Sequence, residues 1–270
     1  MLRRPFALFG TLLAGVVIGG AAVAGVDCSR AANSGSSTPG GTATAFVSPG
    51  LNLASNVDAP ALASPGDFSA LYARVRPSIV EIDVVAQGRR RQIQGQGSGI
   101  VLDKAGHILT NNHVVANSSS ITVLFEDGNT ASASVLGADE ANDLAIVHTD
   151  ADAGELHPAT LGDSSKLKIG NLVAAVGNPF GLDGTFSTGV ISGLDRTFDP
   201  GDGASSEEGM LQTDASINEG SSGGALVNMQ GEVVGVTSAL ENPDASTFAG
   251  VGYAVPINIA KQELPRLEGR

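Results

Sequence analysis

The chain of 270 residues carries 28 acidic and 15 basic side chains, for a formal net charge of −13. Because affinity for nucleic-acid phosphates requires clustered Lys and Arg, this balance argues against a nucleic-acid partner. A single Cys excludes an internal disulfide, and the four scattered His follow no structural zinc pattern. We therefore expect no metal site and no cofactor.

Residues 1–28 differ in character from the rest of the chain. Arg3 and Arg4 precede an uncharged apolar run over residues 6–26, which is long enough to cross a bilayer. An anchor of this kind keeps its arginines in the cytoplasm and places the remaining chain outside. The alternative is a cleaved signal peptide and a secreted protein, because Ala22-Val23-Ala24 fits the A-x-A cleavage pattern. Both interpretations stay open, as does the role of Cys28.

Residues 29–66 are rich in Ser, Thr, Gly, Ala and Pro and show no sustained periodicity, which is typical of a flexible linker. The folded domain is expected over residues 67–270. Its first element is a short helix, capped by Asp67 and ended by Pro77, with Phe68, Leu71, Tyr72 and Val75 on one face.

From residue 78 onward, short apolar runs alternate with turn signals. Residues 80–86 alternate as a half-buried strand does, and Asp127-Gly128 joins two strands in a hairpin. A second hairpin turns at Gln230-Gly231. About a dozen short strands predict an all-β barrel or sandwich fold. Residues 258–267 are expected to form at most a short helix, interrupted by Pro265.

The candidate nucleophile lies in Gly220-Ser221-Ser222-Gly223-Gly224. Glycines on both sides let a substrate carbonyl approach closely and let backbone N–H groups converge, as an oxyanion hole requires. The segment also reads as G-x-S-x-G, the nucleophile elbow of α/β-hydrolases. That interpretation fails because those enzymes place their His after the Ser, whereas here no His follows His157.

The opposite order of His, Asp and Ser belongs to the chymotrypsin arrangement. Among the four His, His113 follows directly after a predicted strand, which is a favourable position for a general base. Asp143 begins the predicted strand over residues 144–147, so its carboxylate would lie at a sheet end. Position alone leaves the base open among His107, His113, His148 and His157, so the residues favour His113 and Asp143 as partners of Ser222 without fixing the triad.

Six motifs in one order resemble the protease domain of the HtrA/Deg serine proteases, which are trypsin-like enzymes of protein quality control. They cover roughly residues 68–260 and are Gly97-Ser98-Gly99-Ile100-Val101, Thr110-Asn111-Asn112-His113-Val114-Val115, Asp143-Leu144-Ala145-Ile146-Val147, Gly177-Asn178-Pro179-Phe180-Gly181, Gln212-Thr213-Asp214-Ala215 and Ser222-Gly223-Gly224-Ala225-Leu226.

The resemblance implies two packed six-stranded antiparallel β-barrels, the first over about residues 78–160 and the second over about residues 161–258. His113 and Asp143 would come from the first barrel and Ser222 from the second. It further implies that Ser222 attacks a peptide carbonyl while His113 takes its proton and Asp143 orients the imidazole. The segment Gly220, Ser221 and Ser222 would form the oxyanion hole.

Substrate preference is read from Ser216, which stands where trypsin carries the Asp that selects Lys and Arg. We therefore expect no preference for Lys or Arg, and the resemblance implies small or aliphatic residues before the cleaved bond. Val236, Thr237 and Ser238 are expected to pair with the substrate backbone as a strand edge, and Tyr253 is a further candidate for substrate binding. The resemblance implies that unfolded proteins are the substrates and that the protein forms a homotrimer, with Phe68 and Tyr72 as candidate contacts.

Two departures from the family pattern concern regulation. Glu219-Gly220-Ser221 replaces the usual Pro-Gly-Asn, and 14 residues follow Pro256, so we expect a form without a PDZ domain. An alternative function is a proteolytically inactive or latent binding or chaperone module. Glu207 and Glu208 are expected in a solvated acidic loop with residues 199–203, whose alternative role would be to gate the site. Arg89-Arg90-Arg91 is expected at a solvated loop tip.

Overall fold

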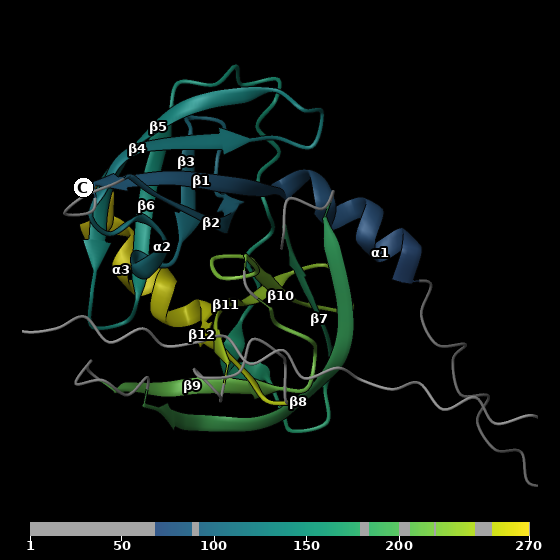
Figure 1. Ribbon diagram of the computed structural model, residues 1–270. Coiled ribbons are helices and arrows are strands. Elements are labelled where there is room, and N and C mark those ends of the chain that lie inside the picture. Colours follow the sequence, from purple (N-terminus) through teal and green to yellow (C-terminus); the bar gives the residue numbers. More distant parts are fainter. Residues whose placement is uncertain are drawn as a thin grey trace, which may run out of the picture. The chain divides into compact units, whose positions relative to one another are not determined.

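The computed structural model describes residues 68–87, 92–178, 184–199, 206–218, 220–240 and 250–269 (Figure 1). The expected anchor and linker lie outside these residues, and so do Cys28, Arg89–Arg91 and Glu219. None of the described helices is both long and apolar enough to cross a membrane.

The expected all-β fold of two barrels is confirmed, because twelve strands form two closed six-stranded barrels. The first barrel has the order β1-β2-β3-β6-β5-β4. Its strands are β1 (Ile79–Gln87), β2 (Gln92–Val101), β3 (His107–Thr110), β4 (Ser118–Leu124), β5 (Thr130–Asp139) and β6 (Leu144–Thr149).

The second barrel has the order β10-β11-β12-β9-β8-β7, and every paired strand in both barrels is antiparallel to its neighbour. Its strands are β7 (Leu172–Gly177), β8 (Thr185–Phe198), β9 (Glu207–Thr213), β10 (Ala225–Asn228), β11 (Val233–Leu240) and β12 (Gly252–Pro256).

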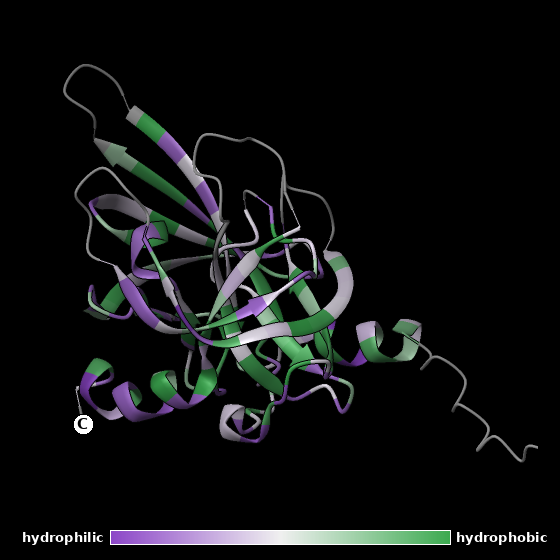
Figure 2. Ribbon diagram, turned by 90° about the horizontal axis from the view of Figure 1, so that it is seen from below, coloured by the Kyte–Doolittle hydropathy of each residue, from purple (hydrophilic) through white to green (hydrophobic). Residues whose placement is uncertain are grey.

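Each barrel encloses its own apolar core, and a third cluster joins them. Val80, Ile82 and Val147 belong to the core of the first barrel, and Val173 and Leu226 to that of the second. Figure 2 shows hydrophobic residues gathered along the strands. The half-buried strand expected over residues 80–86 is buried on both faces at its start, because Glu81 is 5% exposed and faces polar partners.

The described helices are α1 (Phe68–Val75), α2 (Asn112–Val115) and α3 (Ile257–Leu267), with 3₁₀ helices η1 (Arg76–Ser78) and η2 (Ser164–Lys166). Two of them, α1 and α3, contribute to the shared cluster, and α2 packs in the core of the first barrel. The predicted helix over residues 67–75 is confirmed as α1, and its buried Leu71 and Val75 pack in the shared cluster.

The prediction that Pro265 interrupts the last helix is wrong, since α3 runs through it to Leu267. Proline removes one backbone hydrogen bond and costs about 3 kcal/mol within a helix. Burial of Ile257, Ala260 and Leu267 offsets this loss. Arg266 next to the proline pairs with Asp139 of β5 at 3.2 Å, so α3 links the second barrel to the first.

Candidate active site

His113 and Asp143 are in direct contact at one end of the first barrel. His113 lies on α2, and Asp143 lies just before β6. The Nδ1 atom of His113 is 2.6 Å from Oδ2 of Asp143, and the backbone N–H of His113 donates to Oδ1 at 2.9 Å. Asp143 is buried, whereas half of the His113 side chain is exposed. This pairing fixes the imidazole orientation and leaves its outer edge facing solvent.

The backbone of Asp143 adopts an unusual conformation that its neighbours hold in place. Its φ angle is +50°, and the left-handed region costs a residue with a Cβ about 1–2 kcal/mol. The Asp143 carbonyl accepts hydrogen bonds from Asn112 N at 3.2 Å and from Asn111 Nδ2 at 2.8 Å. Asn111 is fully buried, so its amide is a fixed support for the turn that presents the carboxylate.

Ser222 reaches the same place from the second barrel. Its Oγ donates to the carbonyl oxygen of Ser238 at 2.8 Å, and Ser238 Oγ donates to Oδ2 of Asp143 at 3.0 Å. Ser238 therefore links the candidate nucleophile to the candidate acid. In this arrangement the Ser222 hydroxyl proton is directed at Ser238 and not at His113.

A cavity of about 540 Å³ contains both His113 and Ser222. Gly220 lines it as well, and the remaining wall is formed by residues of β1 and β2 together with Val114 and Ala116. Ile93 of β2, 53% exposed, lies at this cavity. The predicted base and the predicted nucleophile therefore line the same cleft, which has residues of both barrels in its wall.

The predicted oxyanion residues form a tight turn. Gly220 and Gly223 both have a φ of +85°, which favours glycine. Within the described part of the chain, no group accepts a hydrogen bond from the N–H of Gly220 or of Ser222. The N–H of Ser221 instead donates to Asn218 O at 2.9 Å. Of the three residues, only Gly220 and Ser222 keep donors for an oxyanion.

The predicted substrate strand lies partly inside the sheet. Val236 pairs with Ala225 of β10 and with Val255 of β12, and Thr237 uses both its backbone groups to bond the nucleophile loop. The expectation of a strand edge is therefore wrong for these two residues. A register shift follows Thr237, and it turns the Ser238 carbonyl toward Ser222.

The other two predicted substrate residues, Ser216 and Tyr253, make contacts within the second barrel. Ser216 is half-buried and accepts a hydrogen bond from Ser187 Oγ at 2.8 Å through its carbonyl. Tyr253 of β12 is 7% exposed, and its ring centroid lies 5.1 Å from that of Phe198. Tyr253 therefore packs in the shared core.

The expectation of a solvated loop is wrong for Glu207. This residue begins β9, is half-buried, and has an Oε2 atom that is inaccessible to solvent and without a hydrogen-bond partner. Burial and the charge of Asp143 raise the pKa of Glu207 to about 7, against an opposing effect of His113. The site thus contains a second acidic group beside Asp143, which the pattern of two adjacent glutamates did not reveal.

The charges around His113 favour its protonated form. Burial lowers the pKa of the His113 imidazole. The hydrogen bond and charge of Asp143 and the charge of Glu207 outweigh that effect, so the pKa lies above its ordinary value. A general base with this environment becomes active only as the pH rises past that value.

One group of potential metal ligands lies elsewhere, where Asp103, His107 and Glu268 bring ligand atoms within 4.8 Å of one another. Asp103 Oδ1 accepts hydrogen bonds from the N–H groups of Ala105 and His107, and Oδ2 contacts His107 Nδ1 at 2.7 Å. These bonds close the β2–β3 turn and account for the pairing of Asp103 with His107 without an ion, so we assign no metal to the group.

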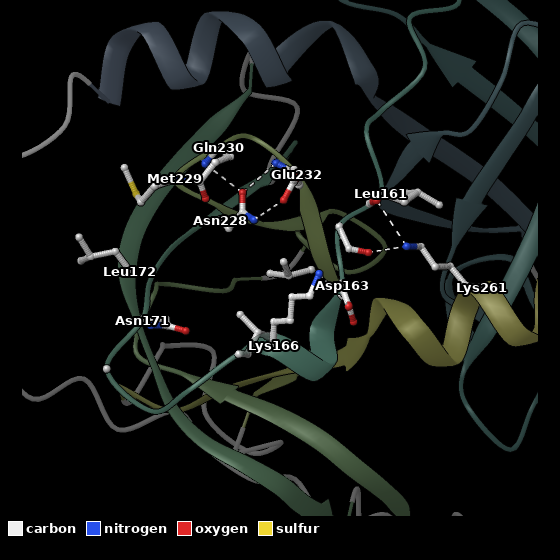
Figure 3. A pocket seen from close by; sticks show the side chains of 14 residues that line it. Leu161, Asp163, Lys166, Asn171, Leu172, Asn228, Met229, Gln230, Glu232 and Lys261 are labelled. Atoms are coloured by element: carbon white, nitrogen blue, oxygen red, sulfur yellow. Dashed lines mark hydrogen bonds and ion pairs between the residues drawn. The ribbon is translucent and has the colours of Figure 1, made fainter.

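A larger cavity of about 770 Å³ opens on the second barrel (Figure 3). None of the predicted site residues lines it. Lys166 pairs with Asp163 at 3.3 Å, and Lys261 donates to the carbonyls of Leu161 and Gly162. The cations of this cavity are thus bound by neighbouring groups of the same barrel.

Sequence reasoning missed the role of Ser98 and the contact of Ser238 with the candidate acid. Ser98 contacts the nucleophile loop through hydrogen bonds at 2.7 Å from its N–H and from its Oγ, and Ser238 contacts Asp143. Ser98 was visible only as part of the motif Gly97-Ser98-Gly99. The flanking glycines are the available signal, because a Cβ at Gly97 would approach the Ser222 carbonyl to 3.2 Å.

Two closed antiparallel barrels, with His and Asp from one and Ser from the other, define the chymotrypsin-like fold. Residues 97–236 match the trypsin-like peptidase domain, and the chain belongs to that family. It is 39% identical over 263 residues to the serine protease PepD of Mycobacterium tuberculosis, covering 91% of this chain and 53% of PepD.

Other relatives are of the HtrA type. The periplasmic serine endoprotease DegP of Salmonella typhimurium is 41% identical over 175 residues, which are 64% of this chain and 36% of DegP. The solved structure of the HtrA-type protease AlgW with a tripeptide superposes with a TM-score of 0.68 at 31% identity, covering 75% of this chain and 64% of that one. The chain spans about half the length of PepD and less of DegP.

Proposed function

We propose that the chain is a serine endopeptidase that hydrolyses peptide bonds of unfolded or damaged proteins. The observation that carries this proposal is the 2.6 Å contact between His113 Nδ1 and Asp143 Oδ2, beside a cleft that also contains Ser222. The family supports it, since PepD and DegP are named serine proteases.

The proposed roles follow from what each group contacts. Ser222 Oγ attacks the carbonyl carbon, and His113 Nε2 takes the hydroxyl proton and later gives it to the leaving amine. Asp143 keeps the remaining imidazole proton on Nδ1 and stabilises the imidazolium that forms. The N–H groups of Gly220 and Ser222 stabilise the oxyanion, and one such donor is worth about 10²–10³ in rate.

The Ser238 carbonyl has two competing uses in this proposal. It accepts a hydrogen bond from the Ser222 hydroxyl before substrate arrives. It is also the first carbonyl of β11 beyond the stretch that bonds β10 and the nucleophile loop. A substrate N–H that binds this carbonyl would displace the hydroxyl and release it toward His113. An unfolded chain meets this requirement because its backbone N–H groups are free.

We propose a preference for small or aliphatic side chains before the cleaved bond. The supporting observation is that Ser216 offers no carboxylate to a Lys or Arg side chain and uses its carbonyl to bind Ser187. Cleavage of a peptide library should therefore give few products ending in Lys or Arg. A majority of such products would contradict the preference.

We propose an extracytoplasmic location, with residues 1–28 as a membrane anchor or a cleaved signal and residues 29–66 as a linker. Support comes from the two arginines before an apolar run and from the periplasmic location given for DegP. Fractionation of cells, with mass analysis of the N-terminus, separates the two alternatives. Activity in the cytoplasmic fraction would contradict both.

We propose a homotrimer through the N-terminal part of the domain. Phe68 and Tyr72 of α1 lie against Phe186 of β8, with ring centroids 6.2 and 5.7 Å away, and both are only partly buried. An aromatic group of this kind is suited to an interface. Sedimentation equilibrium of wild type and of Phe68→Asp tests it. A wild-type monomer would contradict it.

The second candidate is a latent or inactive binding module. It is favoured by the Ser222 hydroxyl, whose proton is directed at Ser238. A fluorophosphonate probe separates the two functions, because it labels only an activated serine. We expect labelling of wild type and of Ser119→Ala, an exposed serine on β4, and none of Ser222→Ala. Equal labelling of all three, or none of a folded wild type, would contradict the peptidase.

A further inference from the structure

Three consecutive carbonyl groups of the nucleophile loop are each held by a hydrogen bond. The Gly220 carbonyl accepts from Ser98 Oγ at 2.7 Å, and the Ser222 carbonyl accepts from Ser98 N at 2.7 Å. The Ser221 carbonyl between them accepts from Thr237 Oγ1 at 2.6 Å. The Ser221 carbonyl also accepts from Gly224 N at 3.0 Å. One residue of the first barrel therefore holds two of the three carbonyls in a loop of the second barrel.

These restraints set the direction of the N–H groups. In a trans peptide the C=O and N–H point in opposite directions and turn together as one plane. The Ser221 carbonyl and the Ser222 N–H share one peptide plane, so holding this carbonyl fixes that N–H. Holding the Gly220 carbonyl fixes the adjoining plane, which joins Gly220 to Ser221. Gly220 has a φ of +85° and no side chain to oppose rotation, so a missing restraint there would allow this plane to turn.

The Ser98 side chain is itself fixed by its surroundings. A hydroxyl has one proton to donate, and Ser98 gives it to Gly220. Ser98 Oγ also accepts from Asn178 N at 2.9 Å, and the Ser98 carbonyl accepts from Thr110 Oγ1 at 2.7 Å. Ser98 is fully buried, so no water competes for these bonds.

Close backbone contacts on several sides leave Ser98 no other position. A Cβ on Gly223 would lie 2.1 Å from the Ser98 carbonyl, and a Cβ on Gly177 would lie 3.0 Å from its Oγ. Asn178 extends the chain of contacts, since its Nδ2 lies 3.5 Å from Oε2 of the buried Glu81. The contacts thus run from β1 through the end of β7 to the nucleophile loop.

We infer that Ser98 is a positioning residue, which holds the Gly220–Ser222 segment so that its two free N–H groups point at one oxyanion. This inference rests on the proposed function, because it concerns the same site. Ser98 acts through Gly220 and Ser222 and touches no substrate atom. Its hydrogen bond from Asn178 also couples the residue that follows β7 to the oxyanion hole.

The test compares Ser98→Ala with Ser98→Thr and with Thr149→Val. Thr149 is a matched control, because it is a buried first-barrel residue whose hydroxyl donates to the Ser132 carbonyl at 2.9 Å, away from the site. We expect Ser98→Ala to lower kcat about 30-fold, less than the 10²–10³ lost with an oxyanion donor itself. KM should change less than about threefold, since ground-state binding does not use the oxyanion hole.

A transition-state analogue separates positioning from general loss of structure. A peptide aldehyde forms a tetrahedral adduct with Ser222 whose oxygen occupies the oxyanion hole. Its affinity should fall in Ser98→Ala in parallel with kcat, and Ser98→Thr should recover most of both by restoring the donor. Thr149→Val should lose a similar amount of thermal stability but keep kcat and aldehyde affinity within about threefold of wild type.

The outcomes distinguish this inference from the proposed function. Absence of fluorophosphonate labelling in folded wild type overturns the function itself. A labelled wild type, with Ser98→Ala matching Thr149→Val in kcat and aldehyde affinity, overturns the role of Ser98 alone. If Ser98→Ala does not fold, the same comparison is made with Ser98→Cys. Its thiol is a weaker donor than a hydroxyl, so its kcat should lie between that of wild type and the value expected without the hydrogen bond.

Discussion

Ser238 Oγ donates a hydrogen bond to Asp143 Oδ2 at 3.0 Å, although 95 positions separate the two residues in the chain. The same oxygen contacts His113 Nδ1. The candidate acid of the first barrel therefore has one partner within its own barrel and one from the other. Correct docking of the two barrels is thus a condition for the full hydrogen bonding of Asp143.

Replacing Ser238 by Ala should lower kcat/KM about tenfold, because a hydrogen bond to a charged group contributes about 1.5 kcal/mol or more. Steady-state kinetics on an unfolded protein such as casein measures the change. Ser119→Ala, at an exposed hydroxyl that binds Val85 O, is the control and should match wild type. A kcat/KM within twofold of wild type for Ser238→Ala would show that the bond has no catalytic effect.

Replacing Asp143 by Asn should lower kcat about 10⁴-fold, because an amide at this position favours the wrong imidazole tautomer. The fluorophosphonate labelling rate should fall in parallel. Circular dichroism checks that the fold is kept, since the Asn112 and Asn111 bonds go to the Asp143 backbone and survive the change. Labelling at the wild-type rate would argue against Asp143 as the acid of the triad.

Replacing Glu207 by Gln should move the acidic limb of the pH–activity profile to lower pH. The negative charge of Glu207 raises the pKa of His113, and a base that holds its proton less tightly becomes active at lower pH. The profile of kcat/KM from pH 5 to 9 measures this shift. Glu208→Gln, an exposed neighbour, should leave the profile unchanged. A shift to higher pH for Glu207→Gln would contradict the assigned charge effect.

The same substitution should change how stability depends on pH. Glu207 has a pKa raised to about 7 from an ordinary 4.5, so the folded chain binds this proton more tightly than the unfolded chain. The resulting stabilisation is complete below pH 4.5 and is lost as the pH rises through about 7. The Tm of Glu207→Gln should therefore exceed the Tm of wild type by a larger margin at pH 8 than at pH 5. Thermal melting at the two pH values measures this change in the Tm difference. Glu208→Gln should show no such change.

Replacing Gly223 by Ala should abolish activity and destabilise the fold. Its φ of +85° disfavours a side chain, and the added Cβ would lie 2.1 Å from the Ser98 carbonyl and 2.3 Å from Thr110 Oγ1. Gly128 has the same φ and nothing within 4 Å of its added Cβ. Gly128→Ala should thus cost only about 1–2 kcal/mol of unfolding free energy and keep its activity. An active Gly223→Ala would contradict the packing described for the loop.

The strand pattern and the motif order predicted much of this fold. Local signals, such as the alternation of apolar residues and the Asp127-Gly128 turn, predicted the strands, the first helix and the β4–β5 hairpin. The family resemblance added the two barrels. Helix α3 differs from its prediction, because tertiary burial of Leu267 outweighs the local preference of Pro265. Helix propensities describe single residues and take no account of such tertiary contacts.

The sequence predicted the residues proposed for chemistry, but not the hydrogen bonds and charge effects that connect them to the rest of the site. The residues proposed for chemistry stand in recognisable motifs, whereas Ser98, Ser238 and Glu207 act through neighbours remote in sequence. Adjacent glutamates ordinarily indicate a solvated surface, and only the fold of β9 buries one of them beside His113. The strand edge expected at Val236 failed for the same reason, since barrel closure is a property of the whole sheet.

Closure of both barrels has a consequence for a protein proposed to handle unfolded chains. Each of the twelve strands has a hydrogen-bonded neighbour on either side, and an open strand edge is a template on which extended chains add and aggregate. A molecule surrounded by misfolded polypeptides would meet such chains constantly. For the proposed function, the closed barrels mean that unfolded chains meet no unpaired strand along either sheet on which to add.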